Sequence, residues 1–150
     1  MNLIAQWLVP TNVVVADLSS KKRLLEVAGQ RVEASHTVSA TAVFESLFAR
    51  EKLGSTALGH GIAIPHGRIK GLNEAVCVFI RLATPLDYDA PDGIPVDLVF
   101  VLLAPAAATD LHLQILAELA QMLSAKAMRE RLRAAPDAAA IYTLIREWNP

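Results

Sequence analysis

The sequence LGHGIAIPHGR, residues 58–68, joins a short apolar run to the tripeptide Pro-His-Gly. The run Ile62-Ala63-Ile64 is typical of a strand, and Pro65 is expected to end it because proline has no N–H to donate to a sheet. Gly67 is expected to adopt a backbone conformation closed to other residues, so that the chain turns sharply. Two interpretations of His66 follow. Taken alone, the tripeptide favours a structural turn residue, but the same turn would hold an imidazole at a strand end where it can react.

The segments on either side of this stretch alternate between helical and strand patterns. Val13-Val14-Val15 predicts a short strand, and Ser19 or Ser20 caps a helix that runs to about Val32. Ser39 caps a second helix over residues 40–52. Three strands are then expected over residues 62–65, 75–82 and 96–104, followed by helices over about 111–123, 125–134 and 138–147. The predicted fold class is α+β: a single domain of residues 1–150 in the order β-α2-β3-α3, with a mixed sheet inside a three-layer α/β/α arrangement.

Composition limits the function classes. The chain has 14 Lys and Arg against 15 Asp and Glu, a formal charge of −1, which argues against nucleic acid or an anionic membrane as the main partner. The single cysteine, Cys77, allows no internal disulfide and fits a reducing compartment. The longest apolar run, residues 98–104, is far shorter than the roughly 20 residues that span a bilayer. A cytoplasmic protein without membrane insertion is therefore expected.

Groups that can bind an anion precede His66 in the sequence. Arg50, Ser55 and Thr56 can donate hydrogen bonds, and Gly59 lets the backbone pass close to a ligand. Together with a nucleophilic imidazole, this inventory suits transient phosphorylation of histidine. Each feature alone has a plainer interpretation, since an arginine at a helix end is more often simply solvated.

His112 is a second candidate. It follows Thr109 and Asp110, either of which can cap the long helix, so the ring is expected in the first helical turn. The positive end of the helix dipole favours a neutral imidazole and a nearby anion, and a neutral ring can donate one hydrogen bond to a phosphoryl oxygen. An ordinary surface histidine fits the same pattern equally well.

The remaining histidines leave a metal site to consider. His60, His66 and His112 could hold zinc with one water, as in a zinc hydrolase, but the spacing lacks the helical i, i+4 pair and no carboxylate stands in a supporting position. The zinc hydrolase stays a distant alternative. His60 is expected in a loop and His36 in solvent before a helix cap, and no metal or organic cofactor is expected.

The longer stretch EKLGSTALGHGIAIPHG, residues 51–67, resembles the phosphorylation-site motif of IIA proteins of the bacterial phosphotransferase system, in the fructose, mannitol and nitrogen class. The resemblance runs from about SSKKRLLE to IYTLIREW and implies a type-2 IIA domain with the β-α2-β3-α3 fold. It implies that His66 accepts a phosphoryl group on Nε2, that His112 assists and that Arg50 meets the phosphoryl oxygens. Ser55, Thr56 and backbone N–H groups, including those of Gly59 and Gly67, would lie behind them.

Within this family, SSKKRLLE, REKLGST, IAIPHGRI and PVDLVFVLLAP are most similar to the nitrogen-regulatory branch. That branch implies a phosphocarrier with a phosphohistidine intermediate and a mainly regulatory role. A small HPr-like carrier, NPr, would phosphorylate the protein, whose phosphorylation state would then control partner proteins. The alternative is a sugar-specific IIA component that passes the phosphoryl group to the IIB domain of a permease.

Overall fold

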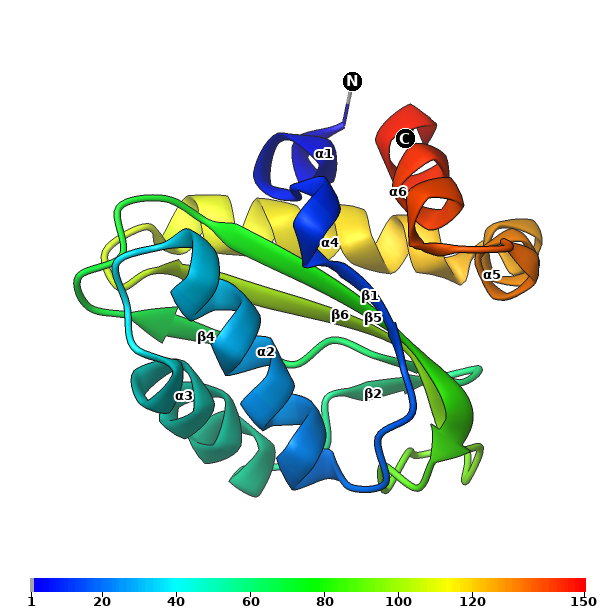
Figure 1. The fold of residues 1–150 in the computed structure, drawn as a ribbon, viewed down its shortest axis with the longest axis horizontal. Coiled ribbons are helices and arrows are strands. Elements are labelled where there is room, and N and C mark those ends of the chain that lie inside the picture. Colours follow the sequence, from blue (N-terminus) through cyan, green and yellow to red (C-terminus); the bar gives the residue numbers. More distant parts are fainter. Residues whose placement is uncertain (1) are drawn as a thin grey trace.

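One mixed sheet with helices on both faces makes up the computed structural model, which describes residues 2–150 (Figure 1). The strands are β1 Val13–Ala16, β2 Ala57–Gly59, β3 Ile62–Ala63, β4 His66–Ile69, β5 Val76–Leu86 and β6 Val96–Pro105. The helices are α1 Leu3–Trp7, α2 Lys21–Ser35, α3 Ala40–Lys52, α4 Thr109–Ser124, α5 Lys126–Ala134 and α6 Ala138–Glu147, with a 3-10 turn, η1, at Pro10–Asn12. The predicted three-layer class with a mixed sheet is confirmed.

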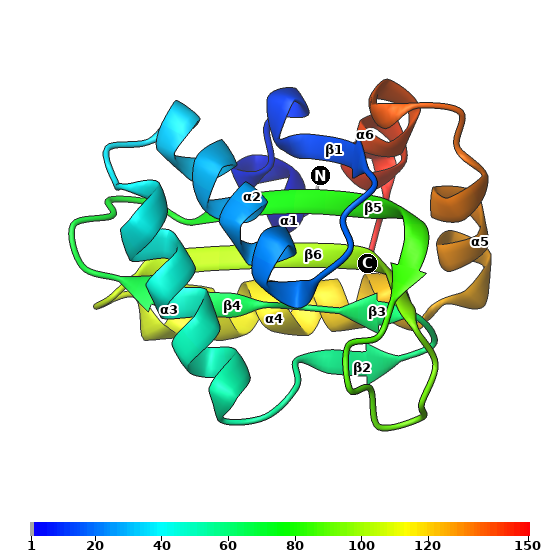
Figure 2. The ribbon, with the colours of Figure 1, turned by 60° about the horizontal axis from the view of Figure 1, so that its bottom comes forward.

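The strand order is β1-β5-β6-β3-β2, and β4 also pairs with β6. Strands β3 and β4 both run parallel to β6, so they follow one another along the same side of it (Figure 2). Strands β5 and β6 are antiparallel, whereas β1 and β5 are parallel. Strand β4 therefore lies at the margin of the sheet, where its side chains can reach both a ligand and the covering helices.

Two apolar cores fill the spaces between the layers, and β6 contributes to both. Its Leu98, Phe100 and Leu102 side chains belong to the core under α1, α4 and α6, while its Val99 and Val101 belong to the core under α2 and α3. A strand that is buried on both faces has a continuous apolar sequence instead of alternating apolar and polar residues. This explains why the run at residues 98–104 is so apolar.

Serine side chains cap the starts of α2 and α3. Ser20 Oγ accepts from Arg23 N at the start of α2, and Ser39 Oγ accepts from Ala42 N at the start of α3, as predicted. The capping prediction for α4 is wrong, because this helix begins at Thr109 and its N-cap residue is Ala108. Thr109 and Asp110 therefore lie inside the first turn. There, the positive end of the helix dipole stabilises the Asp110 carboxylate.

The expected sharp turn after residue 64 is also wrong. Pro65 interrupts the edge strand without reversing it, because its carbonyl oxygen accepts from Leu102 N at 3.0 Å and keeps the chain on β6. Gly67 does not have a positive φ angle. It is needed for space instead, because a Cβ at this position would collide with Ser46 Oγ of α3. The glycine lets α3 pack directly on β4.

Three short elements, α1, β2 and β4, were not predicted. Asn2 caps helix α1: its side-chain oxygen accepts from Ala5 N, and its amide donates to Ile145 O at 2.8 Å and Trp148 O at 2.7 Å. The two ends of the chain therefore lie side by side (Figure 1). Within residues 2–150, no helix combines the length and apolar character needed to cross a membrane.

Candidate functional site

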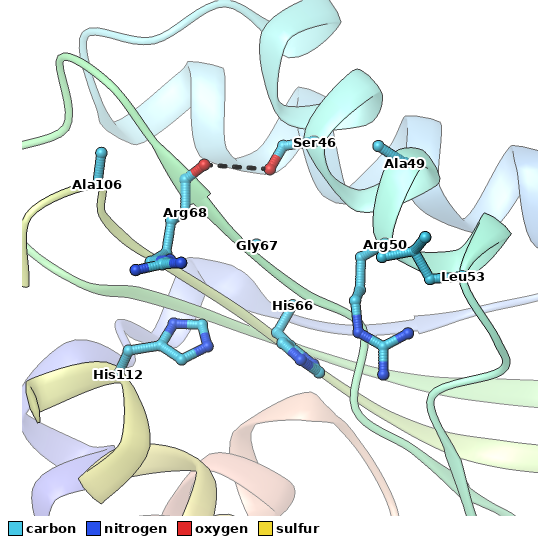
Figure 3. Close-up of a pocket in the computed structure, with 9 residues that line it drawn as sticks. All are labelled: Ser46, Ala49, Arg50, Leu53, His66, Gly67, Arg68, Ala106 and His112. Carbon is cyan, nitrogen blue, oxygen red and sulfur yellow. Dashed lines mark hydrogen bonds between the residues drawn. The ribbon is translucent and has the colours of Figure 1, made fainter. Parts of the chain in front are cut away.

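A pocket of about 620 Å³ opens where β4 passes between the end of α3 and the start of α4 (Figure 3). Its lining residues are Ser46, Ala49, Arg50, Leu53, His66, Gly67, Arg68, Ala106 and His112. The fold thus brings together three residues that are far apart in the sequence and that we predicted to act together: Arg50, His66 and His112.

The His66 ring is held by one hydrogen bond. His66 is half-buried at the first position of β4, and its Nδ1 lies 2.7 Å from the carbonyl oxygen of Ile64. Because a carbonyl oxygen only accepts, Nδ1 must carry the hydrogen, which assigns the tautomer. In the neutral ring the lone pair is therefore on Nε2. This arrangement leaves one ring nitrogen with a lone pair that can act as a nucleophile, and it fixes the direction in which the ring faces.

His112 comes from the first turn of α4, and its ring meets the His66 ring edge-on, with 5.5 Å between centroids and an interplanar angle of 62°. It is only 9% exposed, and Nδ1 has no hydrogen-bond partner among the described residues. Burial of the ring lowers the pKa of His112, and the charges of His66 and Arg68 lower it further. The lowered pKa favours a neutral His112 ring, which places a polar atom without a described partner beside His66.

Two arginines line the same pocket. Arg50, in the last turn of α3, donates from Nη1 to Gly54 O at 2.8 Å, which fixes the guanidinium at the helix end. Arg68 lies on β4 two residues after His66, and the sequence pattern did not point to it. Side chains two apart on a strand share a face. Because residues 66–69 were not predicted to form a strand, the face that Arg68 shares with His66 could not be anticipated from the sequence.

Of the other predicted phosphate ligands, the structure places only Gly67 in the pocket. Ser55 Oγ donates to Tyr88 O at 2.7 Å and accepts from Ala57 N at 3.2 Å, whereas the buried Thr56 hydroxyl donates to the Glu51 carboxylate. These bonds hold the two side chains against Glu51 and the loop at residues 87–95, and neither residue lines the pocket that holds His66. Gly59, at the end of β2, lines a separate, smaller pocket, and only Gly67 of the predicted glycines lies beside His66.

His60 lies apart from the other two candidate zinc ligands. It is an exposed residue between β2 and β3 with φ 57°, and its peptide group is held by Asp92 and Arg133. His60 is not among the residues that line the pocket that holds His66 and His112. Throughout the described part of the chain, no three His, Cys, Asp or Glu side chains gather in a way that could hold a metal ion. The three histidines therefore do not form the zinc site considered above.

Cys77 is buried in the core, as predicted, and burial raises the pKa of its thiol to about 12. His36, expected in solvent, is partly covered, with Nδ1 2.8 Å from Ser35 Oγ and Nε2 3.2 Å from Glu74 Oε1. These contacts tie the junction of α2 and α3 to the loop before β5. Neither residue belongs to the pocket.

Most of the chain is similar to known proteins. The family described as phosphoenolpyruvate-dependent sugar phosphotransferase system, EIIA 2, matches residues 8–148. A nitrogen regulatory protein of Pseudomonas aeruginosa is 49% identical over 127 residues, which cover 84% of this chain and 82% of that protein. The crystal structure of nitrogen regulatory protein IIA-Ntr from Neisseria meningitidis matches with a TM-score of 0.91 and 46% identity, over 96% of this chain and 99% of that one. A fructose-specific EIIA component of Haloferax volcanii is 34% identical over 124 residues, which cover 83% of this chain and 79% of that protein.

Proposed function

The chain belongs to the EIIA 2 family of the phosphoenolpyruvate-dependent sugar phosphotransferase system, and we propose that it accepts a phosphoryl group on His66 from a phosphocarrier protein. Family membership implies a partner of the phosphocarrier type. The observation that carries the proposal is the pairing of His66 Nδ1 with Ile64 O beside the neutral His112 ring. In the neutral ring, this geometry leaves the lone pair on His66 Nε2, in a pocket that also holds two guanidinium groups.

The proposed chemistry needs no proton transfer to or from His66. Nε2 attacks the phosphorus in line, the new P–N bond forms, and the bond to the carrier's histidine nitrogen breaks with its electron pair returning to that nitrogen. The hydrogen on Nδ1 keeps its bond to Ile64 O throughout. Arg50 and His112 would donate to the phosphoryl oxygens, and each charge-assisted bond contributes about 1.5–3 kcal/mol.

The role that we propose is regulatory. The chain is more similar to the nitrogen regulatory proteins, at 49% and 46% identity, than to the fructose-specific component, at 34%. We infer that an NPr-type carrier is the donor, that the reaction takes place in the cytoplasm, where phosphoenolpyruvate is made, and that the phosphorylation state controls partner proteins. The sugar-specific alternative, transfer to a permease IIB domain, is supported by the family description and by the fructose-specific relative.

A reconstituted phosphorylation tests the acceptor. Purified protein would be incubated with phosphoenolpyruvate, enzyme I and either NPr or HPr, and its mass would be measured. We expect one phosphate-sized increase, faster with NPr, that brief acid removes and alkali does not, as for a phosphohistidine. His66→Ala should stay folded, because its ring is only half-buried, and should show no increase. A label that survives acid, or one that forms on His66→Ala, would contradict the assignment to His66. Faster transfer from HPr would favour the sugar-specific branch.

A further inference from the structure

Arg68 shares its face of the edge strand with His66. In β4, Ile69 is buried in the core under α2 and α3, and Gly67 packs against Ser46 of α3. Side chains alternate along a strand, so His66 and Arg68 project to the other face, towards α4. Figure 3 shows the Arg68 guanidinium next to His112 and the Arg50 guanidinium on the opposite side of the His66 ring. The pocket is thus bordered by a positive charge on each side of its nucleophile.

The backbone that carries Arg68 is fixed. Arg68 pairs with Ala104 of β6, and its carbonyl oxygen accepts from Ser46 Oγ at 3.3 Å. The positive charge of Arg68 also acts on the His112 ring, where it adds to the effect of burial. The strand register and the lining of the pocket therefore place this guanidinium beside His66 and His112.

We propose that Arg68 is a second guanidinium ligand of the phosphoryl group on His66, binding its oxygens on the His112 side while Arg50 binds them on the other. This inference rests on the proposed function, because it requires a phosphoryl group on Nε2. A phosphoryl group carries about −1.5 to −2 charge at neutral pH, which one arginine does not balance. In the transfer step the charge spreads over three equatorial oxygens. Arg50, Arg68 and His112 supply one donor group for each.

Phosphotransfer kinetics test the proposal directly, with wild type, Arg68→Gln, Arg68→Lys and Lys70→Gln compared in single-turnover transfer from a pre-phosphorylated NPr-type carrier. Lys70 is the matched control, since it is exposed, lies two residues further on and does not line the pocket. At saturating carrier we expect Arg68→Gln to be about ten- to a hundred-fold slower, because one charge-assisted bond is lost. Arg68→Lys should fall between, because it keeps the charge and loses the planar fork. Lys70→Gln should stay within about two-fold of wild type.

Two outcomes of this assay are separable. If Arg68→Gln and Lys70→Gln transfer at the same saturated rate, Arg68 does not bind the phosphoryl group and the proposal is overturned. If the wild type itself takes up no label, the proposed function fails instead.

A second readout needs no phosphorylation. The charged and titratable groups that line the pocket with His112 are Arg50, His66 and Arg68, so the His112 ring reports on its neighbours. In the unphosphorylated protein, followed by NMR, Arg68→Gln should raise the pKa of His112, because a positive charge that favours the neutral ring is removed. Lys70→Gln should not change it. An unchanged His112 titration in Arg68→Gln would place the guanidinium outside the pocket and overturn the proposal.

Discussion

At the scale of single residues, the two histidines of the pocket differ in how their rings are held. His66 is oriented by a carbonyl oxygen, whereas His112 is buried and keeps Nδ1 without a partner among the described residues. A buried polar atom without a partner is costly unless a ligand satisfies it. The phosphoryl group that we propose on His66 would supply an acceptor for the His112 ring.

The lowered pKa of His112 predicts how stability changes with pH. A histidine in an unfolded chain has a pKa of about 6.5. In the folded protein the pKa of His112 is lower, so between the two values the unfolded chain binds more protons than the folded one. The contribution of His112 to stability is therefore complete above about pH 6.5 and is lost as pH falls through the folded pKa.

Urea unfolding at about pH 7.5 and about pH 5.5, on either side of the unfolded pKa, measures this contribution. His112→Gln should show a smaller pH-dependent loss of stability than wild type, because the amide does not titrate. An equal loss in both proteins would contradict this prediction.

How far the site could be predicted is also decided residue by residue. His66, His112 and Arg50 could be placed together because they occupy motif positions at the ends of long, clearly patterned elements. Ser55 and Thr56 could not, because the orientation of a hydroxyl depends on β2 and on Tyr88, which lies more than 30 positions away in the sequence. Arg68 was missed because only the observed strand shows which face it shares.

At the scale of elements, a buried carboxylate joins α3 to three neighbouring segments. Glu51, next to Arg50, accepts from Tyr88 OH at 3.0 Å, from Lys21 Nζ at 3.2 Å and from both the backbone N–H and the hydroxyl of Thr56. These bonds link the start of α2, the entry to β2 and the loop at residues 87–95. They fix the end of the helix from which Arg50 reaches the pocket.

We expect Glu51→Ala to lower the free energy of unfolding by about 2–4 kcal/mol, because several buried donors lose their acceptor. Tyr88→Phe keeps the ring and removes one hydroxyl, so it should cost about 1–2 kcal/mol. Chemical denaturation of both variants measures the difference. A Glu51→Ala protein as stable as wild type would mean that water replaces the carboxylate without penalty.

The elements differ in how clearly the sequence marks them. Helices α2 and α3 have serine caps and apolar stripes, and β6 has a continuous apolar run, so their positions were predicted closely. Strands β2 and β4 have four residues or fewer and lie towards the sheet margin, where alternation is weak. Helix α1 has five residues and depends on the contacts of Asn2 with the far end of the chain, which no local pattern reveals.

At the scale of the whole molecule, the pocket has an apolar border. Leu53, which lines it, is 84% exposed, and Leu113, which follows His112, is 58% exposed. Large apolar side chains left in solvent beside a reactive group are typical of a surface that a partner covers. We expect the phosphocarrier to dock over them.

Leu53→Glu should therefore raise the carrier concentration at half-maximal rate by about ten-fold or more while the maximal rate changes little, because docking is weakened and the chemistry is not. Leu58→Glu is the matched control, since Leu58 is 51% exposed and lines a different pocket. Steady-state phosphotransfer over a range of carrier concentrations separates the two parameters. An equal effect of both substitutions would show only a general repulsion by added negative charge.

The anchoring of the edge strand β4 has a consequence for how a partner would distinguish the phosphorylated protein from the unphosphorylated one. Pro65 O is bonded to β6, the His66 ring to Ile64 O and the Arg68 carbonyl to α3, so the backbone around the acceptor has little freedom to rearrange. A phosphoryl group would instead add about two negative charges to a chain whose formal charge is −1. The signal would then be electrostatic: a partner would distinguish the two forms by the potential over one small patch, positive without the phosphoryl group and close to neutral with it. Its ability to distinguish them would decline as salt screens that patch.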